Sequence, residues 1–401
     1  MENSSEKNLF LSKISKENDF LLGTIYTIFG VLSVLGNTTL LFVAYRKKSS
    51  LKPAEFFIIN LSISDLGMTI FLFPFAIPSA FAHRWLFTEV MCMCYAFCGV
   101  LFGLCSLSNL TVLSCVCWLK VCCPSYGNKF SPLHAFLLVV GVWCYAAVFA
   151  VGPLSGWGQY GSEPYGTACC IDWHAPSYST PAMIYIIFLF FFCYIVPCTI
   201  IILSYTLIFV TVRESQHAVR QHVSPQNKIS NVQTLIVKLS VAVCIGFLMA
   251  WSPYAVVSMW AAFGEPDLVP PIAFALAAMF AKSSTLYNPV VCLVFKPSFR
   301  KSLCRDATKF RRTLCPCMCQ TKSQPKEATN LPKLKTKEDC NFTWSSNGLH
   351  ESHQSCRHCP KGRMGHYLDI TPQRTARILT GSTHSEVVVS QLSNDMHSDF
   401  L

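Results

Sequence analysis

Seven long stretches of apolar residues, separated by polar loops, dominate the first 295 residues of the chain. They lie at approximately 20–45, 55–81, 90–119, 133–155, 182–211, 234–263 and 268–295. Each can cross a hydrocarbon layer of roughly 30 Å, which takes about 20 residues of α-helix. Because that layer offers the backbone no water, each segment must pair its own N–H and C=O groups as a helix. The pattern therefore predicts an all-α membrane protein, a bundle of seven transmembrane helices.

The loops carry their charges unevenly. The loops after the first, third, fifth and seventh segments are basic, with Arg46, Lys47, Lys48, Lys52, Lys120, Lys129, Arg213, Arg220, Lys228, Lys296, Arg300, Lys301 and Arg305. The alternate loops carry Arg84 beside Glu89, Glu163, Asp172, Glu265 and Asp267. Since basic residues collect on the cytoplasmic side of membrane proteins, we predict that the N-terminus is outside and the C-terminus inside.

Composition agrees with this class. The residues are 52% hydrophobic and 13% charged, and the mean hydropathy is +0.40, unlike a soluble domain. The net charge of +11 follows from the inner loops and favours anionic lipid of the inner leaflet as a partner rather than nucleic acid. The start of the chain lacks the features of a cleavable signal peptide, and no transporter-like internal repeat is present. We predict a multi-pass receptor of the plasma membrane, not an enzyme.

The polar flanks suggest four regions. We predict an extracellular segment at 1–19, the transmembrane domain at 20–296, a juxtamembrane amphipathic helix with a cysteine cluster at 297–319, and a disordered cytoplasmic tail at 320–401. Asn3 is a candidate glycosylation site. The candidate palmitoylation sites are Cys304, Cys315, Cys317 and Cys319. No histidine completes a zinc site there, and many of the 22 cysteines lie in apolar helices, so we expect no metal.

Lys282 stands near the middle of the seventh apolar segment, about 20 Å from either end. At that depth its amine cannot easily extend to water. Six residues later, Asn288-Pro289 interrupts the helix. A lysine in this position either pairs with a buried acid to hold helices together or acts as a nucleophile that forms a Schiff base with an aldehyde. The scarcity of other charges in the segments favours the nucleophile.

Asp65 is a carboxylate in the middle of the second segment, and we expect it to face the bundle interior. Its candidate partners are Asn37 and Asn288. Two roles for Asp65 are open from the sequence: a structural polar contact, and a relay for an ion or water.

Cys92 lies at the outer end of the third segment, and Cys169 and Cys170 lie in the loop after the fourth. Both regions face the oxidising exterior. We therefore expect a disulfide from Cys92 to Cys169 or to Cys170.

The landmarks along these segments resemble a known family. Asn37, Asp65, Trp143, Pro197, Trp251-Ser-Pro253 and Asn288-Pro289 match the helix landmarks of rhodopsin-like G-protein-coupled receptors. Lys282 narrows the resemblance to animal opsins, and the chain is most similar to their neuropsin (opsin-5) group. That likeness rests on Leu51-Lys-Pro-Ala-Glu55, His83-Arg-Trp85, Ser125-Tyr-Gly127, Glu163-Pro-Tyr-Gly-Thr167, Ala250-Trp-Ser-Pro-Tyr-Ala-Val-Val-Ser258, Ala262-Phe-Gly-Glu-Pro-Asp267 and Leu286-Tyr-Asn-Pro289. It covers about residues 20–300.

The resemblance implies a cofactor and its contacts. Lys282 would bind retinal, 11-cis or all-trans, as a Schiff base. Glu163 would be the counterion, because the third-helix position used in vertebrate visual pigments is Tyr95 here, which is no ordinary anion at neutral pH. The positions that match the pocket are Tyr95, Gly99, Gly103, Tyr194, Trp251, Tyr254 and Ala278. The resemblance also favours Cys169 as the partner of Cys92, and makes Asn37, Asp65, Asn288 and Pro289 structural or switch positions.

Two inner-side motifs depart from the family. The Asp/Glu-Arg-Tyr triplet is replaced by Val116-Cys117-Trp118, and the tyrosine of Asn-Pro-x-x-Tyr is replaced by Cys292. In the family the arginine holds the resting state through a charge pair and later contacts the G protein. Cys117 can do neither. The resemblance therefore supports light absorption more strongly than G-protein coupling.

The leading hypothesis is a light-sensing receptor that signals through a heterotrimeric G protein, with arrestin and a receptor kinase acting at the tail. The alternative is a retinal photoisomerase or an opsin that does not couple to a G protein. A receptor for a diffusible ligand with an incidental lysine is a third hypothesis. Tyr95 also leaves an ultraviolet-absorbing, unprotonated Schiff base open.

Overall fold

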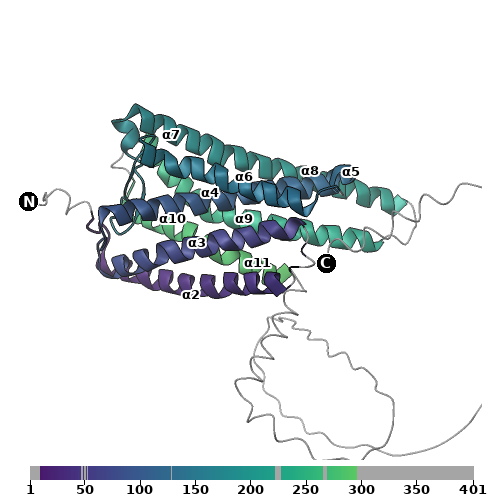
Figure 1. The fold of residues 1–401 in the computed structure, drawn as a ribbon, viewed down its shortest axis with the longest axis horizontal. Coiled ribbons are helices and arrows are strands. Elements are labelled where there is room, and N and C mark those ends of the chain that lie inside the picture. The colour runs from purple at the N-terminus through teal and green to yellow at the C-terminus, as the bar shows by residue number, and fades with distance from the viewer. Residues whose placement is uncertain are drawn as a thin grey trace, which may run out of the picture. The chain divides into compact units, whose positions relative to one another are not determined.

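The described helices lie side by side as a bundle (Figure 1). The computed structural model describes residues 10–46, 48, 51, 53–127, 129–221, 227–264 and 269–295, and the side chains of these residues except 215–221, 227–239, 293 and 295. The seven segments are formed by α2 (Lys16–Arg46), α3 (Pro53–Phe81), α4 (Glu89–Cys122), α6 (Pro132–Val151), α7 (Thr180–Phe190) with α8 (Val196–Gln221), α9 (Asn227–Phe263), and α10 (Pro271–Ser283) with α11 (Tyr287–Phe295). The short helix α5 (Pro124–Gly127) lies between α4 and α6. The predicted seven-helix fold is confirmed, while the amphipathic helix predicted after it lies outside the described residues.

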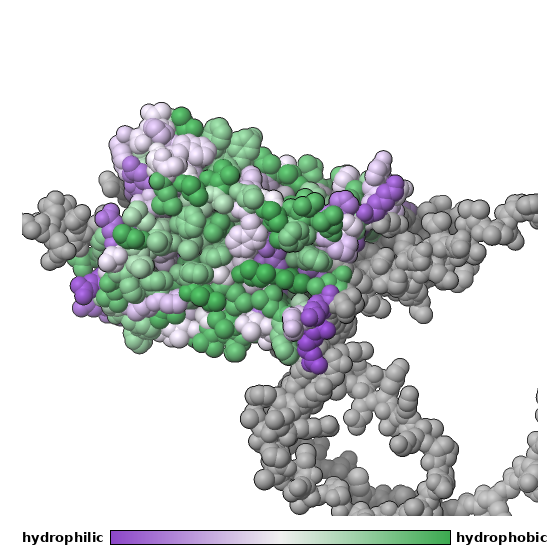
Figure 2. All heavy atoms as spheres, viewed as in Figure 1, coloured by the Kyte–Doolittle hydropathy of each residue, from purple (hydrophilic) through white to green (hydrophobic). Residues whose placement is uncertain are grey.

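The bundle carries an apolar band. Within the described residues, six helical stretches are long and apolar enough to cross a membrane. The seventh segment is divided, because a 3₁₀ turn at Ser284–Leu286 separates α10 from α11. Figure 2 shows hydrophobic residues over the middle of the visible face and hydrophilic residues towards its two ends. We call the end that carries residues 10–15 the outer end, and the opposite one the inner end.

Two predicted helix boundaries are wrong at the inner end. The fifth segment continues to Gln221 instead of ending at 211, and the sixth begins at Asn227 instead of 234. The prediction followed the apolar runs, whereas polar residues such as Arg213 and Glu214 also favour helix and extend it into water. The remaining boundaries lie within a few residues of those predicted.

A π-helical turn at Phe191–Ile195 separates α7 from α8. Pro197 has no N–H to donate to the carbonyl group four residues earlier, which disfavours a regular α-helix here. On this turn the Tyr194 hydroxyl donates to Ser252 Oγ of α9 at 2.8 Å. The irregular turn thus places an aromatic side chain between two helices.

Residues 10–15 form an extended segment across the outer end. Leu11 forms an antiparallel bridge with Arg84 of the α3–α4 loop. The Lys13 N–H donates to the Tyr165 carbonyl oxygen at 3.1 Å. The segment therefore connects two outer loops through backbone hydrogen bonds, which leave little trace in the sequence.

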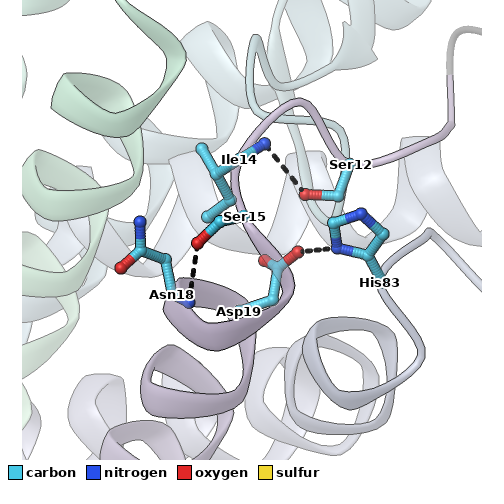
Figure 3. Close-up of polar contacts among 6 residues, drawn as sticks. All are labelled: Ser12, Ile14, Ser15, Asn18, Asp19 and His83. Atoms are coloured by element: carbon cyan, nitrogen blue, oxygen red, sulfur yellow. Dashed lines mark hydrogen bonds and ion pairs between the residues drawn. The ribbon is translucent and has the colours of Figure 1, made fainter.

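Asp19 and His83 join α2 to the α3–α4 loop beneath this segment. Asp19 is buried, and its Oδ2 lies 2.5 Å from His83 Nδ1 (Figure 3). His83 has a φ of 57°, a left-handed conformation that is costly for a residue with a side chain. The Ser12 N–H donates to the His83 carbonyl oxygen at 3.2 Å, which helps to hold this turn.

Gly166→Ala is expected to destabilise the outer end by about 1–3 kcal/mol. Gly166 has a φ of 90°, and a Cβ there would collide with the Leu11 carbonyl group. The measurement is the thermal midpoint of the purified protein. Gly141→Ala is the matched control, because a Cβ added at Gly141 in α6 would meet open space. Equal midpoints for the two variants would contradict the expectation.

Candidate functional site

Lys282 lies in the last turn of α10 and is 7% exposed. The change from α-helix to a 3₁₀ turn directly after it alters the backbone hydrogen bonds. The Ser284 N–H donates to the carbonyl oxygens of Ala281 and Lys282, and Thr285 Oγ1 donates to the Lys282 carbonyl oxygen at 3.1 Å. The lysine is therefore held at a rigid point in the middle of the seventh segment.

The Lys282 side chain lines a cavity of about 160 Å³. A cavity needs roughly 10–15 Å³ to hold one water molecule, so this cavity has room for an organic molecule. Every predicted pocket residue lines it, namely Tyr95, Gly99, Gly103, Glu163, Tyr194, Trp251, Tyr254, Ala278 and Lys282. The structure thus brings together predicted residues from the third, fifth, sixth and seventh segments and from an outer loop.

Other residues of the cavity wall were not predicted from the sequence. They include Met68, Leu72, Ala96, Leu104, Leu107, Ile171, Trp173, Leu189, Phe190, Phe247, Ala255 and Ser258. Helical spacing could have identified some of them, since Ala96 and Leu107 share one face of α4 with Gly99 and Gly103. Trp173 and Ile171 carry no such signal, because strand β2 and the loop after it place them.

Glu163 reaches the cavity from the turn between β1 (Tyr160–Ser162) and β2 (Cys169–Ile171). Its N–H donates to the Ala168 carbonyl oxygen, and its carbonyl accepts from the Gly166 N–H, both at 2.8 Å. The side chain is 4% exposed, and Oε2 has no hydrogen-bond partner. Desolvation raises the pKa of this carboxyl group to about 7, while the charge of Lys282 and the Tyr254 hydroxyl oppose the shift. When ionised, the Glu163 carboxylate is therefore a negative charge near the Lys282 amine.

The raised pKa of Glu163 predicts a pH dependence of stability in the protein without ligand. The ordinary value is 4.5, so between pH 4.5 and about 7 the folded state keeps a proton that the unfolded state has lost. This stabilisation is fully present below pH 4.5 and is lost as the pH rises through 7, by at most about 3 kcal/mol. Thermal midpoints measured across this range should fall less in Glu163→Gln than in the unchanged protein. Glu17→Gln, which removes an exposed carboxylate, is the control; equal slopes in all three proteins would contradict the prediction.

A disulfide joins Cys92 of α4 to Cys169 of β2, as the resemblance implies. It attaches the loop that carries Glu163 to the outer end of α4. Cys170, the other partner that the sequence left open, is a free buried thiol at the cavity wall.

Asp65 and Asn288 are in contact deeper in the bundle. Asn288 Nδ2 donates to Asp65 Oδ2 at 2.5 Å, which selects one of the two predicted partners. The other candidate, Asn37, donates instead to the Thr285 carbonyl oxygen at 2.9 Å. Pro289 lies against Gly36, where a Cβ would be 2.7 Å from the proline ring. These polar groups connect α2, α3 and the end of the seventh segment.

Neutral contacts join several helices near the inner end. Cys117 Sγ of α4 lies 3.4 Å from Ser240 Oγ of α9. The Tyr205 hydroxyl of α8 lies 3.5 Å from Cys244 Sγ, also of α9. Cys292 is buried against Leu40 and Val43 of α2. Thiol and hydroxyl groups therefore join the helices in this region.

Some predicted sites lie outside the described residues. They are Asn3, Cys304, Cys315, Cys317 and Cys319, together with the regions 297–319 and 320–401. These remain predictions from the sequence.

Comparisons with known proteins agree with this arrangement. Residues 36–291 match the family of the 7 transmembrane receptor (rhodopsin family). Opsin-5 of Homo sapiens is 38% identical over 290 residues, which are 72% of this chain and 82% of that protein. The visual pigment-like receptor peropsin of Homo sapiens is 30% identical over 300 residues, covering 75% and 88% of the two chains. The crystal structure of squid rhodopsin is similar with a TM-score of 0.68 at 28% identity, over 78% of this chain and 90% of that one. The chain therefore belongs to the rhodopsin family of seven-transmembrane receptors and, within it, to the opsins.

Proposed function

We propose that this protein is a light-sensing receptor that binds retinal at Lys282. One observation carries the proposal: a buried primary amine opens into a largely apolar, aromatic cavity opposite a buried carboxylate, Glu163. An amine in such a place can react with an aldehyde that has a long apolar body. The carboxylate can balance the positive charge that results. Relatives named opsin, rhodopsin and melanopsin support the same ligand class.

The walls of the cavity fit a flat, conjugated molecule. Gly103 lets Trp251 lie close to α4, since a Cβ there would be 2.9 Å from the indole ring. Tyr254 stands one helical turn farther outward on α9, at 6.3 Å from Trp251 between ring centroids. Bound through a Schiff base at Lys282, retinal would supply light absorption and a change of shape on isomerisation.

Trp251 is placed to pass a change in the cavity to the inner half. It packs against two clusters of buried apolar residues. One contains Tyr95 and Trp173, and the other, nearer the inner end, contains Leu110 and Cys117. Its Nε1 donates to Ser284 Oγ at 3.1 Å, two residues after Lys282. Pro253 lies inside α9 just beyond it, and a proline weakens the helix where it stands. We infer that α9 moves when the cavity changes shape.

The test is an absorption spectrum of the purified protein after incubation with 11-cis retinal and, separately, all-trans retinal. The expected result is a band that changes on illumination. Borohydride reduction followed by peptide mass analysis should place the retinyl group on Lys282. A protein that binds neither isomer at Lys282 would contradict the proposal.

The output of the receptor has two candidate forms. Family membership favours a heterotrimeric G protein as partner. The neutral contact of Cys117 with Ser240 favours the second candidate, a retinal photoisomerase without such coupling, because no arginine stands at the inner end of α4 to meet a G protein. Light-dependent nucleotide exchange on added G proteins would establish the first. Repeated light-driven conversion and release of all-trans retinal, without exchange, would establish the second.

A further inference from the structure

The pair formed by Asp19 and His83 lies at the outer end, and neither residue belongs to the cavity wall (Figure 3). Asp19 is 1% exposed near the start of α2, and its Oδ2 lies 2.5 Å from Nδ1 of His83, which is 28% exposed. A hydrogen bond to a carboxylate is among the stronger ones in proteins, and a buried carboxylate that loses its donor is costly. The pair therefore fixes the α3–α4 loop to α2.

Ser12 connects this pair to the extended segment at 10–15. Its N–H donates to the His83 carbonyl oxygen at 3.2 Å. Its hydroxyl faces the Asp19 carboxyl group. Both members of the pair therefore contact the same residue of the segment, and an intact pair holds that residue in place.

The neighbours of Ser12 contact the turn that carries Glu163. The Lys13 N–H donates to the Tyr165 carbonyl oxygen at 3.1 Å. The Leu11 carbonyl oxygen lies against Gly166, where a Cβ would be 2.0 Å from it. Within the described residues, Lys13 gives this turn its one backbone hydrogen bond from outside the β1–β2 hairpin. The segment thus holds the turn from its outer side.

The other backbone supports of this loop lie at the base of the hairpin. Three residues of β1 pair with three of β2, and Cys169 of β2 forms the disulfide with α4. Glu163 stands beyond the last paired residue, Ser162, in the turn itself. The buried Tyr165 side chain adds a contact inside the bundle. The position of the Glu163 carboxylate therefore depends on what holds the turn, including the segment at 10–15.

We propose that Asp19 and His83 are positioning residues for Glu163. Their hydrogen bond fixes Ser12 and its neighbours, which hold the Glu163 turn against the cavity. With the pair intact, the carboxylate stays buried near the Lys282 nitrogen; without it, the turn loosens and water reaches the carboxylate. The inference rests on the proposed function for its spectroscopic consequence, while the connection from the pair to the turn belongs to the protein without ligand.

The variants remove the hydrogen bond without straining the backbone. Glycine readily adopts a positive φ, so His83→Gly removes the imidazole at a φ of 57° with little strain. Asp19→Ala removes the acceptor. His83→Asn is the conservative variant, because its amide nitrogen stands as many bonds from the backbone as Nδ1 and asparagine tolerates this conformation.

His174→Ala is the matched control. His174 is a half-buried histidine of the loop after β2, and its Nδ1 has no hydrogen-bond partner in the described part of the chain. The control removes an outer-loop imidazole that makes no contact with a carboxylate through this atom. It should behave as the unchanged protein in both measurements.

The first measurement is hydrogen–deuterium exchange of the ligand-free protein at one fixed pH, read on the peptide that covers residues 163–168. In His83→Gly and in Asp19→Ala this exchange should be about tenfold faster, because loss of the hydrogen bond lowers the free energy of local opening. The double variant should match the single ones, since all three remove the same contact. His83→Asn should exchange as the unchanged protein does.

The second measurement is the pH at which half of the protonated band is lost in the retinal-loaded protein. In His83→Gly and Asp19→Ala it should fall by about half a unit, roughly a threefold loss of proton affinity at the nitrogen, because water screens the Glu163 charge. His83→Asn should restore the midpoint. In a Glu163→Gln background neither change should shift the midpoint further, since the pair acts through that carboxylate.

The outcomes separate this inference from the proposed function. Unchanged exchange in both His83→Gly and Asp19→Ala overturns the inference, whether or not retinal binds. Faster exchange in a protein that binds no retinal supports the connection from the pair to the turn and overturns the proposed function. In the loaded protein, an unchanged midpoint, an equal shift in the Glu163→Gln background, or a His83→Asn variant that behaves like His83→Gly overturns the positioning role.

Discussion

Lys282→Ala is expected to abolish the retinal band completely with both isomers, and every light response with it. A Schiff base needs a primary amine, and Lys282 is the one lysine among the described residues of the cavity wall. The measurement is the ratio of the band to protein absorbance after incubation with retinal. Lys16→Ala, which removes an exposed lysine at the outer end of α2, should leave the ratio unchanged.

A loss of the band must be compared with the thermal stability of the Lys282→Ala protein. The Lys282 amine is buried away from water in the folded protein, and burying an amine is costly. Shortening the side chain to the methyl group of alanine is therefore not expected to lower the thermal midpoint of the ligand-free protein. Loss of the band together with an unchanged midpoint would locate the defect in the chemistry. A Lys282→Ala protein that still gave the band would move the attachment to another residue and overturn the assignment.

The apolar pattern was sufficient for the seven-helix fold because the membrane imposes both length and helical structure. It was insufficient where other forces decide. The division of the seventh segment comes at Ser284–Leu286, before the proline that suggested it, because serine and threonine hydroxyls there support a 3₁₀ turn. The outer segment at 10–15 is held by backbone hydrogen bonds, which a pattern of side chains cannot predict.

The site was predicted unevenly for a similar reason. The depth of Lys282 in its apolar segment identified this residue, and the resemblance to opsins supplied Glu163 and the glycine and aromatic positions of the wall. The structure brings all of them to one cavity. Trp173 lay outside that prediction because it reaches the cavity from a loop whose path depends on the rest of the fold. Composition and spacing within a helix contain no such tertiary information.

The two ends of the bundle differ in chemistry. At the outer end, the buried Lys282 amine and the buried Glu163 carboxyl group lie beneath a loop that a disulfide joins to α4. At the inner end, Cys117 and Ser240 make a neutral contact between α4 and α9. A thiol–hydroxyl contact is weaker than a charge-assisted hydrogen bond. Less free energy is therefore needed to separate α9 from α4 at this point than in a receptor with an arginine charge pair.

Glu163→Gln is expected to lower the pH at which half of the protonated retinal band is lost by about 1–3 units. Glutamine keeps the size and hydrogen-bonding capacity of the side chain and removes its charge, so the effect reports on electrostatics. Glu163 is the one carboxylate among the described residues of the cavity wall. Because the site is buried, solvent screens the positive charge on the nitrogen poorly once this carboxylate is removed. Near neutral pH the variant should therefore absorb in the near ultraviolet under conditions where the unchanged protein is protonated.

Two further variants complete the test. Glu163→Asp keeps the charge and should retain most of the midpoint, while Glu17→Gln removes an exposed carboxylate and should not change it. A Glu163→Gln protein with an unchanged midpoint would assign the balancing charge elsewhere, and Asp65, bonded to Asn288, would be the next residue to replace. Without ligand, desolvation keeps Glu163 half-protonated near pH 7. A positive charge fixed on the Lys282 nitrogen would favour the ionised form, so loading the protein with retinal should release a proton from Glu163 in that pH range.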